Sequence, residues 1–293
     1  MTRQARAATD QARKIPPQPH KMASKVRKMT AQARKMTPPA RADAIVRHLA
    51  KSELNIGARI LSAVQATQEV VSCNTNLGII LLCAPLVYAA ERAYAGLPLR
   101  RSLERVLANL DIADAEYAFA AISLASPGGL GKSERYDVQA TPTVTLLEAM
   151  NEARQRDRIA CQYVNGYYDV FEIGVPHIRQ AIARWHSEEW AAVACYLSLV
   201  SRLTDSHIAR KFGVDVARKV SREAIHLESA LARSHEPESL LGRLLEWDRQ
   251  LKERGLNPGT SADLTVASLL AVRIEDMLIQ HVTHGDEFRL TLQ

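Results

Sequence analysis

Apolar residues recur three and four positions apart along almost the whole chain from Ala42 onwards. This spacing places them on one face of an α-helix, and the alternating pattern of a half-buried strand is rare here. The links between these periodic segments are short. We therefore predict one compact all-α domain over residues 42–293. Its expected helices run near residues 42–53, 57–72, 75–95, 99–109, 111–125, 143–154, 157–171, 175–203, 205–212, 214–232, 237–254 and 260–281.

The first 41 residues differ from the rest of the chain. They carry 11 lysines and arginines against one acid, Asp10, and few leucines or aromatic residues. Such a segment buries too little apolar surface to offset the entropy of ordering, so we expect a basic, disordered tail over residues 1–41. Residues 42–293 carry 27 basic against 31 acidic side chains. The net charge of +6 therefore says little about the partner of the folded part.

Composition narrows the class of protein further. Aromatic residues make up only 5%, which favours helix-on-helix packing. The most apolar run, residues 77–90, is too short to cross a bilayer and contains Pro85, so we expect a buried helix and no membrane partner. Four scattered cysteines without a Cys-x-x-Cys pair favour free thiols in a reducing compartment. With no apolar secretory segment visible, we expect a cytoplasmic protein.

Three predicted helices begin with polar residues that can bind a ligand. The clearest start is Asn257–Leu264, where a tight turn leads into Thr260, Ser261 and Asp263. Amides and hydroxyls at a helix N-terminus bind phosphate, and a carboxylate can hold a phosphate-bound metal ion. The same spacing also fits a capping box, in which Asp263 only returns a hydrogen bond to Thr260.

The second start precedes the apolar run 77–90. Asn74, Thr75 and Asn76 supply polar side chains there, and Gly78 leaves room for a neighbouring backbone or ligand to come close. Asn74 alone could instead be an ordinary N-cap.

The third start is that of the helix predicted over residues 205–212. Asp205 and His207 open it, with Arg210 and Lys211 one turn further on. Asp205 could hold Mg²⁺ or act as a base while the cations contact phosphate; the alternative is an ordinary acidic first turn followed by solvated cations. If the three starts converge, they form an anion-binding pocket.

The longest gap between predicted helices, Ser126–Thr141, is the expected active-site loop. Its glycines, Gly129 and Gly131 among them, would let the loop fold closely over a ligand. The segment Ser126–Ser133 ends in Gly-Lys-Ser like a phosphate-binding motif, but Ser126 replaces the first glycine of that motif, and a predicted helix precedes it instead of a strand. We therefore do not expect a nucleotide kinase.

Together these segments resemble the triphosphoribosyl-dephospho-coenzyme A synthase family. The resemblance rests on Asn74-Thr-Asn-x-Gly78, on Asp205-Ser-His-Ile208 followed by basic residues, and on Asn257–Leu264, in that order across about 190 residues. It implies an all-α transferase that uses ATP, Mg²⁺ and 3′-dephospho-coenzyme A (dephospho-CoA). In that reaction the acceptor's ribose 2′-hydroxyl attacks the anomeric carbon of the ATP ribose. Adenine leaves, and the triphosphate stays on the product, a prosthetic-group precursor.

The resemblance also implies roles for individual residues. Asp205 and Asp263 would be Mg²⁺ ligands or the catalytic base. The residues expected to bind substrate are Asn74, Thr75, Asn76, Gly78, Gly129, Gly131, His207, Arg210, Lys211 and Ser261.

Some segments depart from the family's pattern. Lys14-Ile-Pro-Pro stands in place of an amino-terminal Lys-Pro-Gly motif, and Lys211-Phe-Gly213 in place of Arg-Gly-Gly. Ser126–Gly131 and Pro142–Glu148 look more like a divergent branch linked to tetrahydromethanopterin metabolism, so a pterin precursor is the alternative acceptor. A helical nucleic-acid-binding protein with a basic arm is the non-enzyme alternative, although we do not expect nucleic acid as the partner. The sequence assigns no oligomeric state.

Overall fold

The computed structural model describes residues 54–71, 76–93, 97–127 and 133–284. Every regular element in these ranges is helical, which confirms the predicted all-α class. The basic segment 1–41 and the helix predicted near 42–53 lie outside the described residues. The elements are α4 (Ile56–Val71), α5 (Leu77–Glu91), α6 (Leu99–Ala108), α7 (Ile112–Ala125), α8 (Leu146–Ala153), α9 (Arg158–Asn165), η1 (Asp169–Gly174), α10 (Val175–Trp185), α11 (Glu188–Arg202), α12 (Ser206–Phe212), α13 (Val214–Arg233), η2 (Pro237–Leu240), α14 (Leu241–Glu253) and α15 (Gly259–His284).

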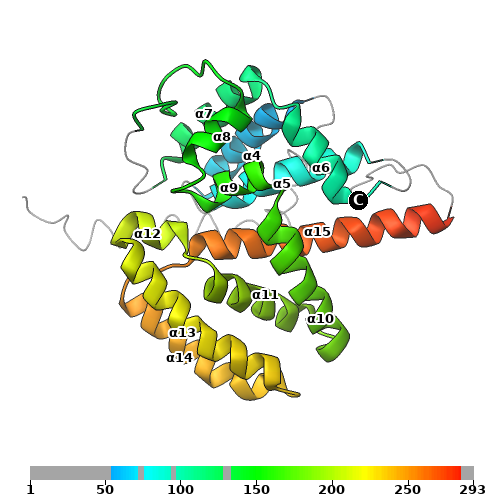
Figure 1. Ribbon diagram of the computed structural model, residues 1–293, viewed down its shortest axis with the longest axis vertical. Helices are drawn as coiled ribbons and strands as arrows, with labels where there is room; N and C mark the ends of the chain where they lie inside the picture. Colours follow the sequence, from blue (N-terminus) through cyan, green and yellow to red (C-terminus); the bar gives the residue numbers. More distant parts are fainter. Residues whose placement is uncertain (1–53, 72–75, 94–96, 128–132, 285–293) are drawn as a thin grey trace, which may run out of the picture. The chain divides into compact units, whose positions relative to one another are not determined.

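The long helix α15 belongs to the larger of two hydrophobic clusters, and α11 contributes side chains to both clusters. Helix α15 packs against α5 and also against α11, and Figure 1 shows it running between the α4–α9 helices and the α10–α14 helices. The larger cluster gathers side chains of α4–α11, η1 and α15. The smaller one lies mainly among α11, α13 and α14 and includes Leu197, Val220 and Trp247. Burial of these apolar faces supplies the main driving force that holds the helices together.

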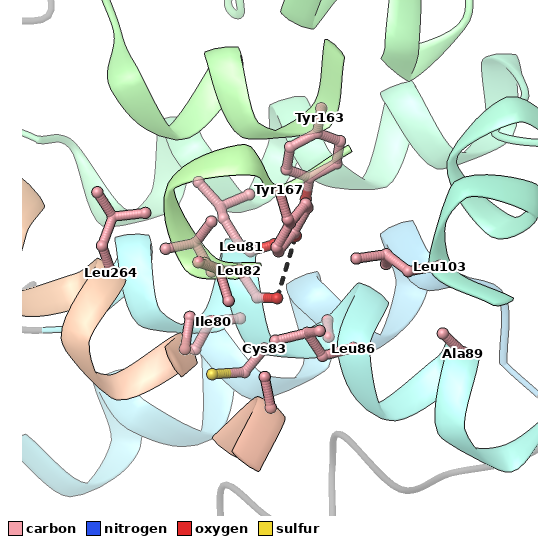
Figure 2. Packing of buried hydrophobic residues seen from close by; sticks show 14 of the residues in the cluster. Ile80, Leu81, Leu82, Cys83, Leu86, Ala89, Leu103, Tyr163, Tyr167 and Leu264 are labelled. Carbon is pink, nitrogen blue, oxygen red and sulfur yellow. Dashed lines mark hydrogen bonds between the residues drawn. The ribbon is translucent and has the colours of Figure 1, made fainter. Parts of the chain in front are cut away.

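Helix α5 is buried along most of its length, as its apolar sequence predicts. Pro85 has no N–H, so the carbonyl of Leu81 loses its usual partner within the helix. The Tyr163 hydroxyl donates a hydrogen bond to that carbonyl at 2.6 Å, and the Tyr167 hydroxyl donates to Leu82 O at 3.1 Å (Figure 2). Two buried tyrosines therefore tie α9 and the turn after it to α5. No helix in the described ranges is long and apolar enough to cross a membrane.

The prediction of one helix over residues 175–203 is wrong. The chain turns at His186, whose φ of 51° is left-handed and ends α10. Ser187 then caps α11, since its hydroxyl accepts a hydrogen bond from the Trp190 N–H at 3.2 Å. Without a glycine or proline at the break, hydrophobic periodicity alone did not reveal it.

The helix predicted over residues 157–171 also differs from the structure. Helix α9 ends at Gly166, whose φ is 64°, and a π-helical segment, η1, follows at Asp169. Gly174 ends η1 against α15: a Cβ there would lie 1.9 Å from Ser268 Oγ, so only glycine fits. The wider π turn places the fully buried Asp169 beside α9.

Candidate functional site

A cleft of about 1480 Å³ is lined by the first turns of α5, α12 and α15, which are far apart in the sequence. The structure thus brings the three polar helix starts to one place. The expected site residues that line the cleft are Asn76, Gly78, His207, Arg210, Lys211 and Asp263.

Asp205 instead joins the starts of α12 and α15. Its Oδ1 accepts hydrogen bonds from the N–H groups of His207 at 3.0 Å and Ile208 at 3.1 Å, which makes it the N-cap of α12. Its Oδ2 accepts from the N–H and the hydroxyl of Ser261, both at 2.9 Å. Burial raises the pKa of Asp205, although these bonds favour the ionised form. Both oxygens are engaged within the protein, which does not fit the expected role of metal ligand or base.

A second set of hydrogen bonds runs through hydroxyl groups. Thr260 Oγ1 accepts from the His207 N–H at 3.1 Å and lies 3.0 Å from Ser206 Oγ. Ser206 Oγ in turn accepts from the Arg158 N–H at 3.1 Å. These bonds tie the starts of α9, α12 and α15 together. Thr260 already lies inside α15, and none of the hydrogen bonds of the described residues joins it to Asp263, so the capping-box alternative does not form.

Asp263 is the carboxylate of α15 that lines the cleft. Within the described part of the chain it has no hydrogen-bond or ion-pair partner. Burial, together with the negative charges of Asp205 and Asp157, raises its pKa to about 7. A carboxyl group with this pKa can accept and release a proton near neutral pH, which is typical of a catalytic group.

Gly78 lets the Asp263 carboxylate come close to α5. A Cβ at Gly78 would lie 2.0 Å from Asp263 Oδ2 and 2.6 Å from Ile159 Cδ1. The close neighbour of Gly78 is therefore the carboxylate of another helix, whereas the sequence predicted a backbone or a ligand.

We expect the Gly78→Ala variant to be destabilised by about 1–3 kcal/mol, because its methyl group overpacks this contact. An unobstructed Gly→Ala change in a helix has the opposite effect, a gain of roughly 0.5–1 kcal/mol. Gly242→Ala is the matched control, since nothing lies within 4 Å of a Cβ at that helical glycine. The measurement is urea unfolding of both variants. Equal stability of the two would show that the contact at Gly78 is unimportant.

His207 lines the cleft beside the first residue of α15. A Cβ at Gly259 would lie 2.9 Å from its Nδ1, so this glycine allows the imidazole to pack closely. Burial lowers the pKa of His207, and the positive charges of Lys211 and Arg210 lower it further. The ring is therefore neutral at pH 7, with one nitrogen as donor and the other as acceptor.

The start of α5 differs from the sequence expectation. Asn76, not Asn74, is the residue before the first turn, and its side chain makes no capping bond. The Asn76 amide donates to Thr67 Oγ1 at 3.1 Å instead, which fixes it at the cleft wall. Asn74 and Thr75 lie outside the described residues.

The expected active-site loop contributes to the cleft. Its described residues that line it are Ser126, Pro127, Ser133, Arg135, Tyr136, Asp137 and Val138. Gly129 and Gly131 lie outside the described residues. Helix α7, not a strand, precedes the loop, as the sequence predicts, and this context does not match that of a phosphate-binding motif.

Sequence reasoning missed the corner between α8 and α9, because the run of arginines there reads as a solvated face. Asp157 caps α9, accepting from the N–H groups of Ile159 and Ala160, and its Oδ2 accepts from Arg210 at 3.2 Å. Arg158 makes two hydrogen bonds to Asp169. The missed signal was an aspartate directly ahead of a periodic apolar run, which is an N-cap pattern.

Positive charge dominates the cleft lining. The lining contains three carboxylates, those of Asp137, Asp157 and Asp263. It contains seven cations: Arg135, Arg154, Arg156, Arg158, Arg202, Arg210 and Lys211. An excess of guanidinium groups suits a polyphosphate ligand. Within the described ranges, no group of three His, Cys, Asp or Glu side chains is placed to hold a metal ion.

Comparison with known proteins agrees with this picture. Two proteins from Pseudomonas fluorescens strains Pf-5 and Pf0-1, each named "Probable 2-(5''-triphosphoribosyl)-3'-dephosphocoenzyme-A synthase", are 31% identical over 115 and 112 residues. Each match spans 38% of this chain and only 37% of the relative.

A solved structure from Archaeoglobus fulgidus shares the fold. That protein, provisionally named triphosphoribosyl-dephospho-coA synthase, aligns with a TM-score of 0.62 and 24% identity over 80% of this chain and 98% of its own. A model of the CitG family, described as ATP:dephospho-CoA triphosphoribosyl transferase, matches residues 22–281. Because this match covers most of the sequence, the chain belongs to the CitG, ATP:dephospho-CoA triphosphoribosyl transferase, family.

Proposed function

We propose that this protein transfers the triphosphoribosyl group of ATP to the ribose 2′-hydroxyl of dephospho-CoA, with release of adenine, in the cleft described above. The family match supports the reaction class. The single observation that carries the assignment to this cleft is Asp263, a carboxylate without a protein partner among the described residues, within a lining dominated by cations.

The reaction replaces one glycosidic bond by another. The acceptor oxygen bonds to C1′ of the ATP ribose while the bond from C1′ to adenine N9 breaks. The acceptor hydroxyl gives up its proton, and adenine leaves with the bonding electron pair and takes up a proton. Positive charge develops on the ribose in the transition state, so nearby carboxylates favour it, while the arginines offset the charge of the triphosphate.

Asp263 is the base in this proposal. A base must be ionised to accept the hydroxyl proton and should have a pKa close to the working pH. The pKa of about 7 meets this condition, whereas the oxygens of Asp205 already accept four hydrogen bonds. Asp205 and Ser261 then act by positioning the helix starts.

Two other residues are available to position the substrates. Neutral His207 can donate or accept one hydrogen bond at the cleft wall. Asn76, held by Thr67, keeps its side-chain carbonyl oxygen as an acceptor for a ribose hydroxyl.

Mg²⁺ fits this lining as a companion of ATP. It is usually held by one or two carboxylates together with substrate phosphates and water, and does not require a protein cage of three ligands. When bound, it would neutralise triphosphate charge. Asp157 Oδ2 is a carboxylate oxygen of the cleft that could contribute to holding it, since it accepts one hydrogen bond, from Arg210, and Asp263 is assigned as the base.

The pH dependence of kcat/KM tests the role of Asp263. Because the ionised form is the active one, we expect kcat/KM to rise with pH and level off above a midpoint near pH 7. A carboxylate that serves as a Mg²⁺ ligand would have a much lower pKa in the complex. A profile that is flat from pH 5.5 to 8.5 would therefore rule out the base role.

Adenine release tests the function itself. The full chain is incubated with Mg²⁺, ATP and dephospho-CoA, and adenine and the triphosphoribosylated product are measured by chromatography and mass spectrometry. Coenzyme A and the absence of an acceptor are the controls. Release only with pterin precursors would replace the proposed acceptor, and no release with any acceptor would reject the transferase function.

A further inference from the structure

The cleft is larger than one small ligand requires. Pockets for one drug-sized ligand span about 300–1,000 Å³, whereas this cleft measures about 1480 Å³. Six of its seven cations form two groups, whose side chains are bound by different elements of the fold. The seventh, Arg202, pairs with Glu228 and belongs to neither group. Arg158 of α9 together with Arg210 and Lys211 of α12 is called the α12 group. Arg135 of the loop together with Arg154 and Arg156, which lie between α8 and α9, is called the loop group.

The α12 group is held beside the hydroxyl network. Arg158 Nε and Nη2 donate to Asp169 at 2.6 and 2.7 Å, and Asp169 is 0% exposed. Gln162 fixes this carboxylate, because its Nε2 donates to Oδ2 at 2.6 Å. A guanidinium held in this way loses little freedom when it binds an anion. The third member, Lys211, is exposed and has no ion-pair partner among the described residues.

Two members of the loop group contact the loop and α8. Arg156 donates to Ser133 Oγ at 2.8 Å, and Arg135 lies 3.6 Å from Glu152 of α8. Arg156 and Arg158 flank Asp157, yet their side chains are bound by separate parts of the chain. The loop joins α7 to α8, and these two helices carry an apolar stretch of the cleft wall: Phe119, Ile122, Leu146, Ala149 and Met150.

We propose that the cleft holds both nucleotides at once, with the triphosphate of ATP on the α12 group and the diphosphate of dephospho-CoA on the loop group. This inference rests on the proposed function, which requires two phosphate-bearing ligands. The pantetheine arm of the acceptor carries methylene and dimethyl groups between its amides, and ATP has no such arm, so the apolar wall beside the loop group identifies the acceptor's half. The other half holds ATP close to His207 and Thr260.

Direct binding measurements test this division. Titration calorimetry of the full chain with ATP alone and with dephospho-CoA alone gives both dissociation constants without turnover. Lys211→Gln and Arg156→Gln form a matched pair, since each removes one exposed cation from the cleft lining. Arg179→Gln is the control, because Arg179 pairs with Glu275 and Asp276 away from the cleft.

The two substitutions should have opposite selectivity. Loss of one charged contact weakens binding by about tenfold or more. Lys211→Gln should raise the Kd of ATP by this factor and leave that of dephospho-CoA within about twofold, and Arg156→Gln should do the reverse. The double variant Arg158→Gln/Asp169→Asn removes a second cation of the α12 group without leaving a buried charge unpaired, and should also weaken ATP alone.

Three results would overturn the division: equal weakening of both ligands by each substitution, the reversed selectivity, or no weakening at all. Wild-type protein that binds neither nucleotide would reject the proposed function together with the division. Wild-type protein that binds both, with variants that do not discriminate, would reject the division alone.

Discussion

Asp263→Asn is expected to lower turnover by about 10²–10⁴-fold, the usual contribution of a general base. Asparagine has nearly the same shape, so the contact with Gly78 survives, but its amide cannot take up the acceptor proton. The measurement is the rate of adenine release at saturating ATP and dephospho-CoA. Asp215→Asn is the control, because that carboxylate is 93% exposed, lies outside the cleft lining and should leave the rate unchanged.

The stability of the same variant shows whether turnover falls because the base is missing or because the protein unfolds. The pKa of Asp263 is raised from 3.8 to about 7 on folding, so the folded state binds the proton more tightly than the unfolded state. This group therefore costs the native protein stability as pH rises from about 4 to about 7, and the full cost remains above pH 7. Asp263→Asn should be at least as stable as the wild type at pH 8. A variant that keeps wild-type turnover would remove Asp263 from the mechanism.

The convergence of three helix starts was predictable because each start carries more polar side chains than a single N-cap requires. Asn76, His207 and Asp263 were identified by their positions ahead of apolar runs, and all three line the cleft. Helix periodicity also located most of the elements, since a buried face repeats at a fixed spacing. The fold class followed from the same pattern.

The different roles proposed for the two aspartates were not predictable. Asp205 and Asp263 occupy similar sequence contexts, each near the start of a helix. Their difference arises from a contact across 56 positions, because Ser261 supplies two donors to Asp205 and no described residue supplies an equivalent donor to Asp263. Local sequence indicates which side chains can bind but does not reveal which neighbour from a distant helix will satisfy them.

The role of Arg158 was hidden for a related reason. A run of arginines on a helix face is normally solvated, and the partner that changes this interpretation, Asp169, is placed by a π turn. Such turns have no clear sequence pattern. The site was therefore predictable where the signal is local, and not predictable where a tertiary contact decides the role.

Asp205→Ala is expected to destabilise the protein by about 3 kcal/mol, combining the loss of an N-cap with the loss of two bonds from Ser261. Urea unfolding measures this effect. The matched control is Ser187→Ala, which removes the N-cap of α11 and one exposed hydrogen bond to Glu189, and should cost only about 1 kcal/mol. Turnover should fall as well, since the starts of α12 and α15 are no longer held together and His207 and Asp263 are displaced.

The two aspartates are thus expected to respond differently to substitution: substitution of Asp205 lowers stability and turnover together, whereas substitution of Asp263 lowers turnover alone. An Asp205→Ala variant with wild-type stability and no turnover would return Asp205 to the chemical step.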